Sequence, residues 1–224
     1  MFTETQGLEL NLFQEILRAV SSAMKIPVII ILLCFIAFSA FCIGWVIVEA
    51  LTERRHMKYS LPSLLDEMKS GVKPLQECIA DSGLLFRQKA ALTELTLHPD
   101  FNKKMLTSLA DSVLEDEENY YDGKVKITNL VSKLGPMVGL LGTLIPLGPG
   151  IIALGQGDTY TLSESMLTAF DTTVAGLIVA AVCLIISAIR TKWYAKYMSD
   201  LETLVDCVVE IQFENKEIKE DKAE

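Results

Sequence analysis

The stretch LGPMVGLLGTLIPLGPGIIALGQGD, residues 134–158, decides the fold of this chain. It holds seven glycines and three prolines, yet its only charged residue is Asp158 at the end. Glycine and proline weaken helices in water, so the composition suggests a loop, but a loop would also carry polar residues. In lipid, small residues let helices approach closely, and neighbouring helices satisfy the backbone groups that proline frees. The stretch is therefore predicted to be a membrane-spanning helix packed closely against another helix.

The glycines of this stretch recur every three or four residues, which places them on one helix face where a partner helix can pack. The residues predicted to serve helix packing are Gly135, Gly139, Gly142 and, in the next apolar run, Gly176. Pro146 and Pro149 are expected to bend or break the helix toward its far end. Gly155–Asp158 is expected to form the exit turn.

Two further apolar runs are long enough to cross a bilayer. Residues 26–48 are uncharged and would extend about 34 Å as a helix. A cleaved signal peptide is the alternative for this run, but the run is too long and an amphipathic segment precedes it. Residues 165–189 contain one charge, Asp171. Thr161 and Glu164 form a capping box, which predicts that this helix begins at Leu162.

The sequence thus predicts an all-α integral membrane protein with three transmembrane helices and long cytoplasmic helical extensions. Arg and Lys residues follow the first and third runs closely, which predicts an external N-terminus and a cytoplasmic C-terminus. Within the cytoplasmic part, acidic residues 115–118 are expected to end one helix and Gly123 to begin the next. The predicted segments are an external amphipathic helix (1–25), transmembrane helix 1 (26–50), a cytoplasmic helical region (51–131), transmembrane helix 2 (132–155), a short external loop (156–162), transmembrane helix 3 (163–189) and a cytoplasmic C-terminal helix (190–224).

Several classes of function are disfavoured. The net charge of −9 argues against a nucleic-acid partner. The five cysteines form no close pair, and His56 and His98 stand alone, so neither a disulfide, a metal site, a cofactor nor a catalytic residue is predicted. A dinucleotide-like pattern at 148–153 lies inside a predicted span without a preceding strand. The chain is predicted not to be an enzyme.

One hypothesis for the chain is an intramembrane aspartyl protease. Tyr121-Asp122 and Gly155–Asp158 resemble the paired motifs of that class, in which two carboxylates face each other within the bilayer. Here 36 residues separate the two aspartates, and a mostly helical path would hold them several tens of ångströms apart. The protease hypothesis is therefore not preferred.

Asp171 is the one charge inside the third run, and a carboxylate at mid-bilayer costs about 2.5 to 3.5 kcal/mol. An intramembrane aspartate is thus a candidate functional residue. Its neighbours on one helix face are expected to avoid lipid; these are Ser165, Thr168, Thr172, Ala175 and Val179. The alternative is an Asp171 that bonds nearby hydroxyls at a helix contact.

Two motifs, GLLGT (139–143) and TAFDTTVAGLIVAA (168–181), together with the three-span plan, resemble the MotA/TolQ/ExbB proton channel family, in particular its TolQ- and ExbB-like inner-membrane subunits. The resemblance implies a ring of five copies around two single-span helices of a second protein similar to ExbD, TolR or MotB. It also implies that Thr143 and Thr173 face the pore. This chain departs from the family pattern at one position. TolQ- and ExbB-like members carry an acidic residue five positions before the matched threonine, Thr173, but this chain has Thr168 there. Its Asp171 lies two positions before Thr173.

The resulting hypothesis is a channel-forming subunit of a motor driven by the proton or sodium motive force, located in the cell (inner) plasma membrane. Spans two and three would line a central pore, and the motor would energise a partner protein, as in protein transport. The expected partners are further copies as a homopentamer, a dimeric single-span subunit and the lipid bilayer. The alternative is a passive membrane scaffold without ion conduction. The candidate ion-pathway residues are Thr143, Thr168, Asp171, Thr172 and Thr173.

Overall fold

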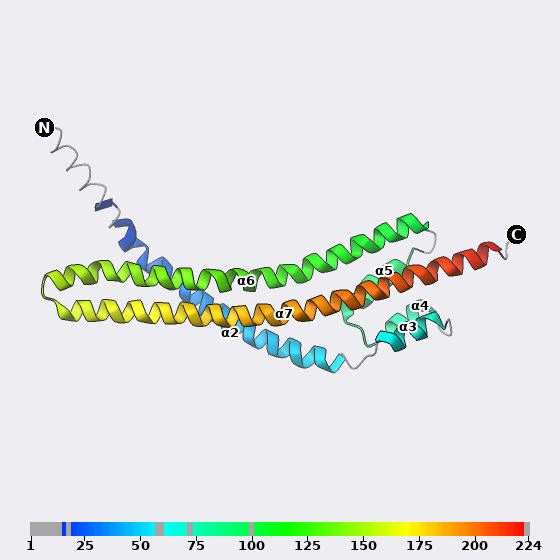
Figure 1. Ribbon diagram of the computed structural model, residues 1–224, viewed down its shortest axis with the longest axis horizontal. Coiled ribbons are helices and arrows are strands. Elements are labelled where there is room, and N and C mark those ends of the chain that lie inside the picture. The colour runs from blue at the N-terminus through cyan, green and yellow to red at the C-terminus, as the bar shows by residue number, and fades with distance from the viewer. Residues whose placement is uncertain (1–14, 17–18, 57–60, 71–73, 99–100, 222–224) are drawn as a thin grey trace, which may run out of the picture. The chain divides into compact units, whose positions relative to one another are not determined.

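The computed structural model describes residues 15–16, 19–56, 61–70, 74–98 and 101–221 (Figure 1). Its elements are α2 (Lys25–His56), α3 (Leu61–Lys69), α4 (Leu75–Asp81), α5 (Phe86–Thr96), α6 (Lys103–Gly155) and α7 (Thr159–Asp221). Three helical stretches, Ala19–Leu51, Lys103–Gly155 and Thr159–Glu214, are long and apolar enough to cross a membrane. The predicted all-α membrane fold is confirmed. The predicted amphipathic helix at 1–25 lies mostly outside the described residues.

The described residues belong to two compact units, and α2, α6 and α7 each contribute to both. The first, here called the hairpin unit, comprises Met1–Gly44 and Ile127–Ser187. The second, here called the extension unit, comprises Trp45–Lys126 and Ala188–Glu224. Each unit is described by itself below.

In the hairpin unit, α6 and α7 run side by side and are joined by a tight turn (Figure 1). Pro136, Pro146 and Pro149 all lie inside α6, which continues to Gly155. Of the predicted bend or break at Pro146 and Pro149, the break is therefore wrong. Because α7 packs along α6, a neighbouring helix supports the backbone where the prolines remove N–H donors.

The turn between α6 and α7 depends on Gly157 and Asp158. Gly157 has a φ of +76°, a left-handed conformation that glycine adopts without a steric penalty. The Asp158 carboxylate then accepts hydrogen bonds from the Thr161 backbone N–H (3.1 Å) and the Thr161 hydroxyl (2.5 Å). Asp158 therefore caps α7, which begins at Thr159 instead of the predicted Leu162. The connection is correspondingly shorter than the predicted loop at 156–162.

In the extension unit, α6 passes through residues 115–123 without interruption, so the predicted helix end and restart there are wrong. Tertiary contacts outweigh the local signals. The Glu117 carboxylate pairs with Arg87 of α5 at 2.8 Å, and the ring of Tyr121 lies 4.6 Å from that of Tyr194 on α7. A glycine inside a helix costs only about 1 kcal/mol, which leaves Gly123 tolerable.

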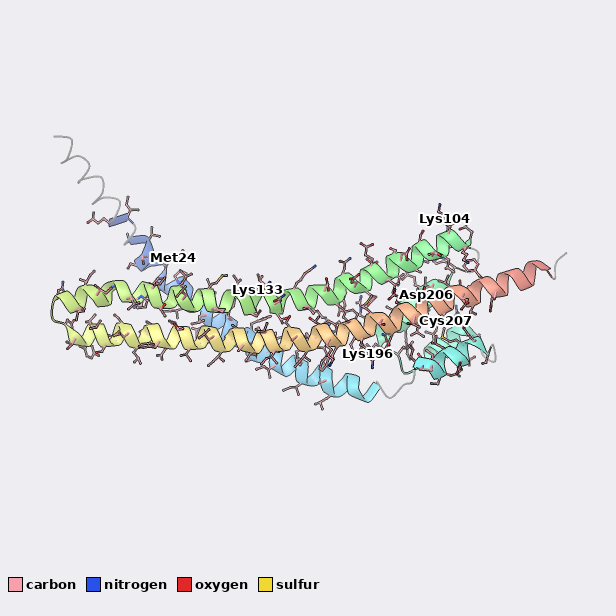
Figure 2. The ribbon with its side chains drawn as sticks, viewed as in Figure 1. Met24, Lys104, Lys133, Lys196, Asp206 and Cys207 are labelled. Atoms are coloured by element: carbon pink, nitrogen blue, oxygen red, sulfur yellow. The ribbon has the colours of Figure 1, made fainter. Side chains whose placement is uncertain are left out.

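The core of the extension unit lies between α3–α5 and the extended parts of α6 and α7. Figure 2 shows Asp206 and Cys207 of α7 beside the short helices. Leu92, Leu95 and Leu204 are completely buried in this core. The apolar stripe predicted after the third span faces inward; its buried members are Tyr194, Tyr197, Leu201, Leu204, Val205 and Val208.

Candidate functional site

The predicted packing glycines lie in the contact between α6 and α7 of the same chain. A Cβ atom added to Gly176 would lie 2.7 Å from the carbonyl oxygen of Gly135 and 2.9 Å from the Cα of Gly139. One added to Gly142 would lie 2.7 Å from both Cβ and Oγ1 of Thr172. Larger residues at these positions would force the two backbones apart, so the glycines set the distance between the helices.

Helix α2 covers one flank of the α6–α7 hairpin. Its Phe35 and Phe38 pack against a buried cluster of Val131 on α6 with Val179 and Cys183 on α7. We call this side of the hairpin the covered flank and the opposite side the open flank.

Thr143 and Thr173 both lie on the open flank. At 100° per residue, Thr173 and Val179 are rotated by about 60° to opposite sides of the contact residue Gly176. On α6, Val131 is rotated by about 40° to one side of Gly135 and Thr143 by about 80° to the other. Because Val131 and Val179 mark the covered flank, the two threonines share the other one.

The two open-flank threonines also lie at nearly the same level of the hairpin. Gly139 is next to the backbone of Thr173 and Gly142 is next to Thr172, so Thr143 and Thr173 differ by less than one helix turn. Both are half-buried within the single chain. The Thr143 hydroxyl donates to the Leu140 carbonyl (2.7 Å) and that of Thr173 to the Ala169 carbonyl (3.1 Å).

The other three candidate pathway residues lie elsewhere on α7. Thr172 is buried in the α6–α7 contact, and its hydroxyl donates to the carbonyls of Thr168 and Ala169 at 3.0 Å. Thr168 and Asp171 are rotated toward the covered-flank side, and Asp171 is exposed on the single chain. Asp171 and Thr173 are about 160° apart around the helix. The structure therefore brings Thr143 and Thr173 together and separates them from Asp171.

The open flank has the chemistry of a path for protons or hydrated cations. A threonine hydroxyl that donates to its own helix keeps its oxygen lone pairs available as acceptors. In a span, this arrangement satisfies the hydroxyl hydrogen while presenting an acceptor to a passing ion, a water molecule or another helix. Among the described residues, no group of three or more His, Cys, Asp or Glu side chains could hold a metal ion.

A buried ion pair in the extension unit was not predicted from the sequence. Glu49, near the end of the first span, accepts hydrogen bonds on Oε2 from Nη2 (3.2 Å) and Nε (3.3 Å) of Arg190. Its Oε1 accepts a 2.8 Å hydrogen bond from the Tyr194 hydroxyl. The side chains of Arg190 and Glu49 are only 7% and 8% exposed.

The signal for this pair was present in the sequence. Glu49 is the first charged residue after the first apolar run, and Arg190 is the first charged residue after the third. The predicted topology puts both at the cytoplasmic ends of their spans, where opposite charges at one depth can pair. Because both carboxylate oxygens and the guanidinium fork are engaged, the cluster ties α2 to α7 at a fixed register.

Comparisons with known proteins identify the family of the chain. A model of the MotA/TolQ/ExbB proton channel family matches residues 83–203. The chain is also similar to the biopolymer transport protein exbB1 of Vibrio cholerae, with 26% identity over 118 residues, covering 51% of this chain. The chain spans about half the length of this curated relative, 52%. The match to the family model covers more than half of the sequence and includes both hydroxyl-bearing motifs, and the chain belongs to the MotA/TolQ/ExbB proton channel family.

Proposed function

We propose that this chain is the channel-forming subunit of a membrane motor that uses the proton or sodium motive force to energise a partner protein. Membership of a proton channel family supports ion conduction, and three apolar helices support a multi-pass protein of the inner membrane. The name of its relative, a biopolymer transport protein, supports a transport process as the driven task. The positions of Lys and Arg support an external N-terminus and a cytoplasmic C-terminus.

The observation that carries this proposal is the shared open flank of Thr143 and Thr173. In the proposed assembly, five copies stand in a ring with their open flanks turned toward the axis. A dimer of single-span subunits occupies that axis, and its helices approach α6 and α7. Helix α2, on the covered flank, then lies on the lipid side of the ring. The two hydroxyls of each copy line the path between ring and central helices.

Asp171 has a different role in this proposal. It lies about 160° from Thr173 around α7, so both cannot face one axis. A carboxylate exposed to lipid would cost about 2.5 to 3.5 kcal/mol, which favours a position where a neighbouring copy covers it. We therefore assign the ion path to Thr143 and Thr173 and a contact between subunits to Asp171.

Proton uptake into vesicles that contain the chain and its single-span partner tests the proposal. Thr143→Val and Thr173→Val keep the side-chain shape but remove the hydroxyl, and a lost hydrogen bond of about 1.4 kcal/mol corresponds to about tenfold slower flux. Thr168→Val is the matched control, since its hydroxyl also donates to a carbonyl of its own helix but lies toward the covered flank.

The possible results separate the hypotheses. The motor proposal predicts uptake by the wild-type chain, slow uptake by the Thr143 and Thr173 variants and nearly normal uptake by Thr168→Val. A passive scaffold would give no uptake in any sample, although the partner would still bind. If Thr143→Val and Thr173→Val conducted as fast as the wild type, the assigned path would be wrong.

A further inference from the structure

Three acidic side chains form a row on one side of α6 in the extension unit. Glu115, Glu118 and Asp122 are all exposed and follow the i, i+3, i+7 spacing of a single helix face. Glu118 and Asp122 also line a cavity of about 420 Å³ between α6 and α7, together with Glu202. Its other lining residues include Tyr121 and Tyr194, and none of the residues that line it is basic. The groove therefore has an acidic rim and an aromatic floor.

A basic ridge occupies the far side of α7. Tyr194 faces α6, and Lys192 and Lys196 each stand two residues from it, about 160° around the helix in either direction. Both lysines are exposed, and Lys196 is labelled in Figure 2. Among the described residues, neither lysine has an ion-pair partner within the chain. The acidic row and the basic ridge thus lie on different sides of the same two-helix structure.

The acids and the lysines lie at matching levels. The helices are antiparallel, and the rings of Tyr121 and Tyr194 are 4.6 Å apart, which fixes their register. Counted from that contact toward the α6–α7 turn, Asp122 is one residue away on α6 and Lys192 is two residues away on α7. Their heights along the helix axes therefore differ by about 1.5 Å. Glu118 is three residues and Lys196 two residues in the opposite direction, again about 1.5 Å apart.

We propose that this acidic groove is a docking site for a second copy of the same chain, whose Lys192 and Lys196 meet Asp122 and Glu118. Copies that stand side by side at equal height bring both pairs together without any vertical shift. The contact is head-to-tail, since each copy offers its acidic groove to one neighbour and its basic ridge to the other, and such contacts generate rings. The inference rests on the proposed ring and adds the surface that fixes its register.

The chain's own contacts leave room for this docking. Asp122 has a loose ion pair with Lys126, at 3.8 Å, and the side chains are 60% and 75% exposed respectively. Such exposed pairs exchange readily with other cations. Complementary charges at a rim contribute mainly to orientation and specificity, so the apolar faces of the hairpin would supply most of the affinity.

Crosslinking with a short bismaleimide tests the inference. The background variant is Cys34→Ser, because Cys34 is the exposed cysteine and the other four are buried. Lys192→Cys and Asp122→Cys are placed in separate chains, which are co-expressed in membranes. A head-to-tail contact predicts a crosslinked dimer in the mixture and none from either variant alone. A chain that carries both substitutions should give a ladder of products up to the full ring.

The matched control replaces Asp122→Cys with Asp111→Cys, an exposed acid on α6 that lies about 16 Å from Asp122 along the helix. It should not link to Lys192→Cys. An intact oligomer, measured by native mass, without the Lys192–Asp122 link would overturn this inference but leave the proposed motor standing. Self-linking of Asp122→Cys would also overturn it. A chain that is monomeric in its native membrane would overturn both.

Discussion

At the scale of single residues, the Glu49–Arg190 pair shows how a membrane protein places charges at the end of a span. Glu49 accepts from both Arg190 and Tyr194, so its two carboxylate oxygens are satisfied although the side chain is only 8% exposed. The desolvation of each charge is offset only while its partner is present. This pair therefore fixes how α2 meets α7 more than it adds net stability.

Glu49→Gln should destabilise the chain, because it leaves the Arg190 guanidinium buried without a counter-charge. Removal of one partner from a buried pair typically costs about 3 to 5 kcal/mol, and thermal unfolding in detergent should register a clearly lower Tm. The double variant Glu49→Leu with Arg190→Met should recover much of this loss. Lys126→Ala is the control, since its exposed pair with Asp122 contributes about 1 kcal/mol or less. Equal Tm values for Glu49→Gln and Lys126→Ala would contradict this account.

At the scale of elements, α6 and α7 bring their backbones close together at the glycines. Gly176 approaches Gly135 and Gly139 so closely that even a methyl group would meet backbone atoms at 2.7 and 2.9 Å. Backbone cannot rotate out of the way as a side chain can. Close approach of this kind is how helices associate in lipid, where the hydrophobic effect gives no drive.

Gly176→Ala should weaken the hairpin by about 1 to 3 kcal/mol, as expected for an overpacked contact. Gly148→Ala provides the control on α6, because a Cβ there meets nothing within 4 Å and alanine favours the helix. Denaturant unfolding in mixed micelles would measure both. The account fails here if Gly176→Ala is as stable as Gly148→Ala.

The cap of α7 should depend on pH through Asp158. Hydrogen bonds from Thr161 lower the pKa of this carboxyl below its usual value of 3.8. A lowered folded-state pKa means that the stabilisation is present above the unfolded value and is lost as the pH falls through the folded one. At low pH, hydrogen exchange of the Thr161 amide should therefore be faster in the wild-type chain than in the Asp158→Asn variant, because asparagine keeps an uncharged acceptor. Identical exchange ratios at neutral pH and about pH 2 would contradict the assignment of the cap.

Some of these elements could be predicted from the sequence and others could not, for physical reasons. The apolar runs and the spacing of Gly135, Gly139 and Gly142 are local patterns, so the spans and the close contact could be predicted. The continuity of α6 through Gly123 and Pro146 depends on packing against other helices, which local propensity does not contain. The Glu49–Arg190 pair joins residues 141 apart in the chain, and only matching the depths of the two span ends could have revealed it.

The candidate pathway divides in the same way. The motifs around Thr143 and Thr173 could be recognised, and helical phase alone places Asp171 and Thr173 about 160° apart around one helix. The flank that each residue occupies could not be predicted without the position of α2. Its Phe35 and Phe38 cover the side of the hairpin that Val131 and Val179 mark. The contact between helices distant in the chain was thus the missing information.

At the scale of the whole molecule, the proposed function makes one chain only part of a channel. Many large apolar side chains of its helices, such as Leu140, Leu144 and Phe170, are exposed on the single chain and require lipid or protein around them. The proposed ring would supply both, since one side of each copy would face its neighbours and another would face the bilayer. The central claim is that the open flank of the hairpin is turned toward the axis of that ring.

The most direct test is a cryo-electron microscopy structure of the chain with its single-span partner in a lipid bilayer. The account predicts a closed ring of copies in which the side chains of Thr143 and Thr173 face the central helices and α2 faces lipid. A ring with Thr143 and Thr173 surrounded by acyl chains, or a chain that remains a single copy beside its partner, would contradict it.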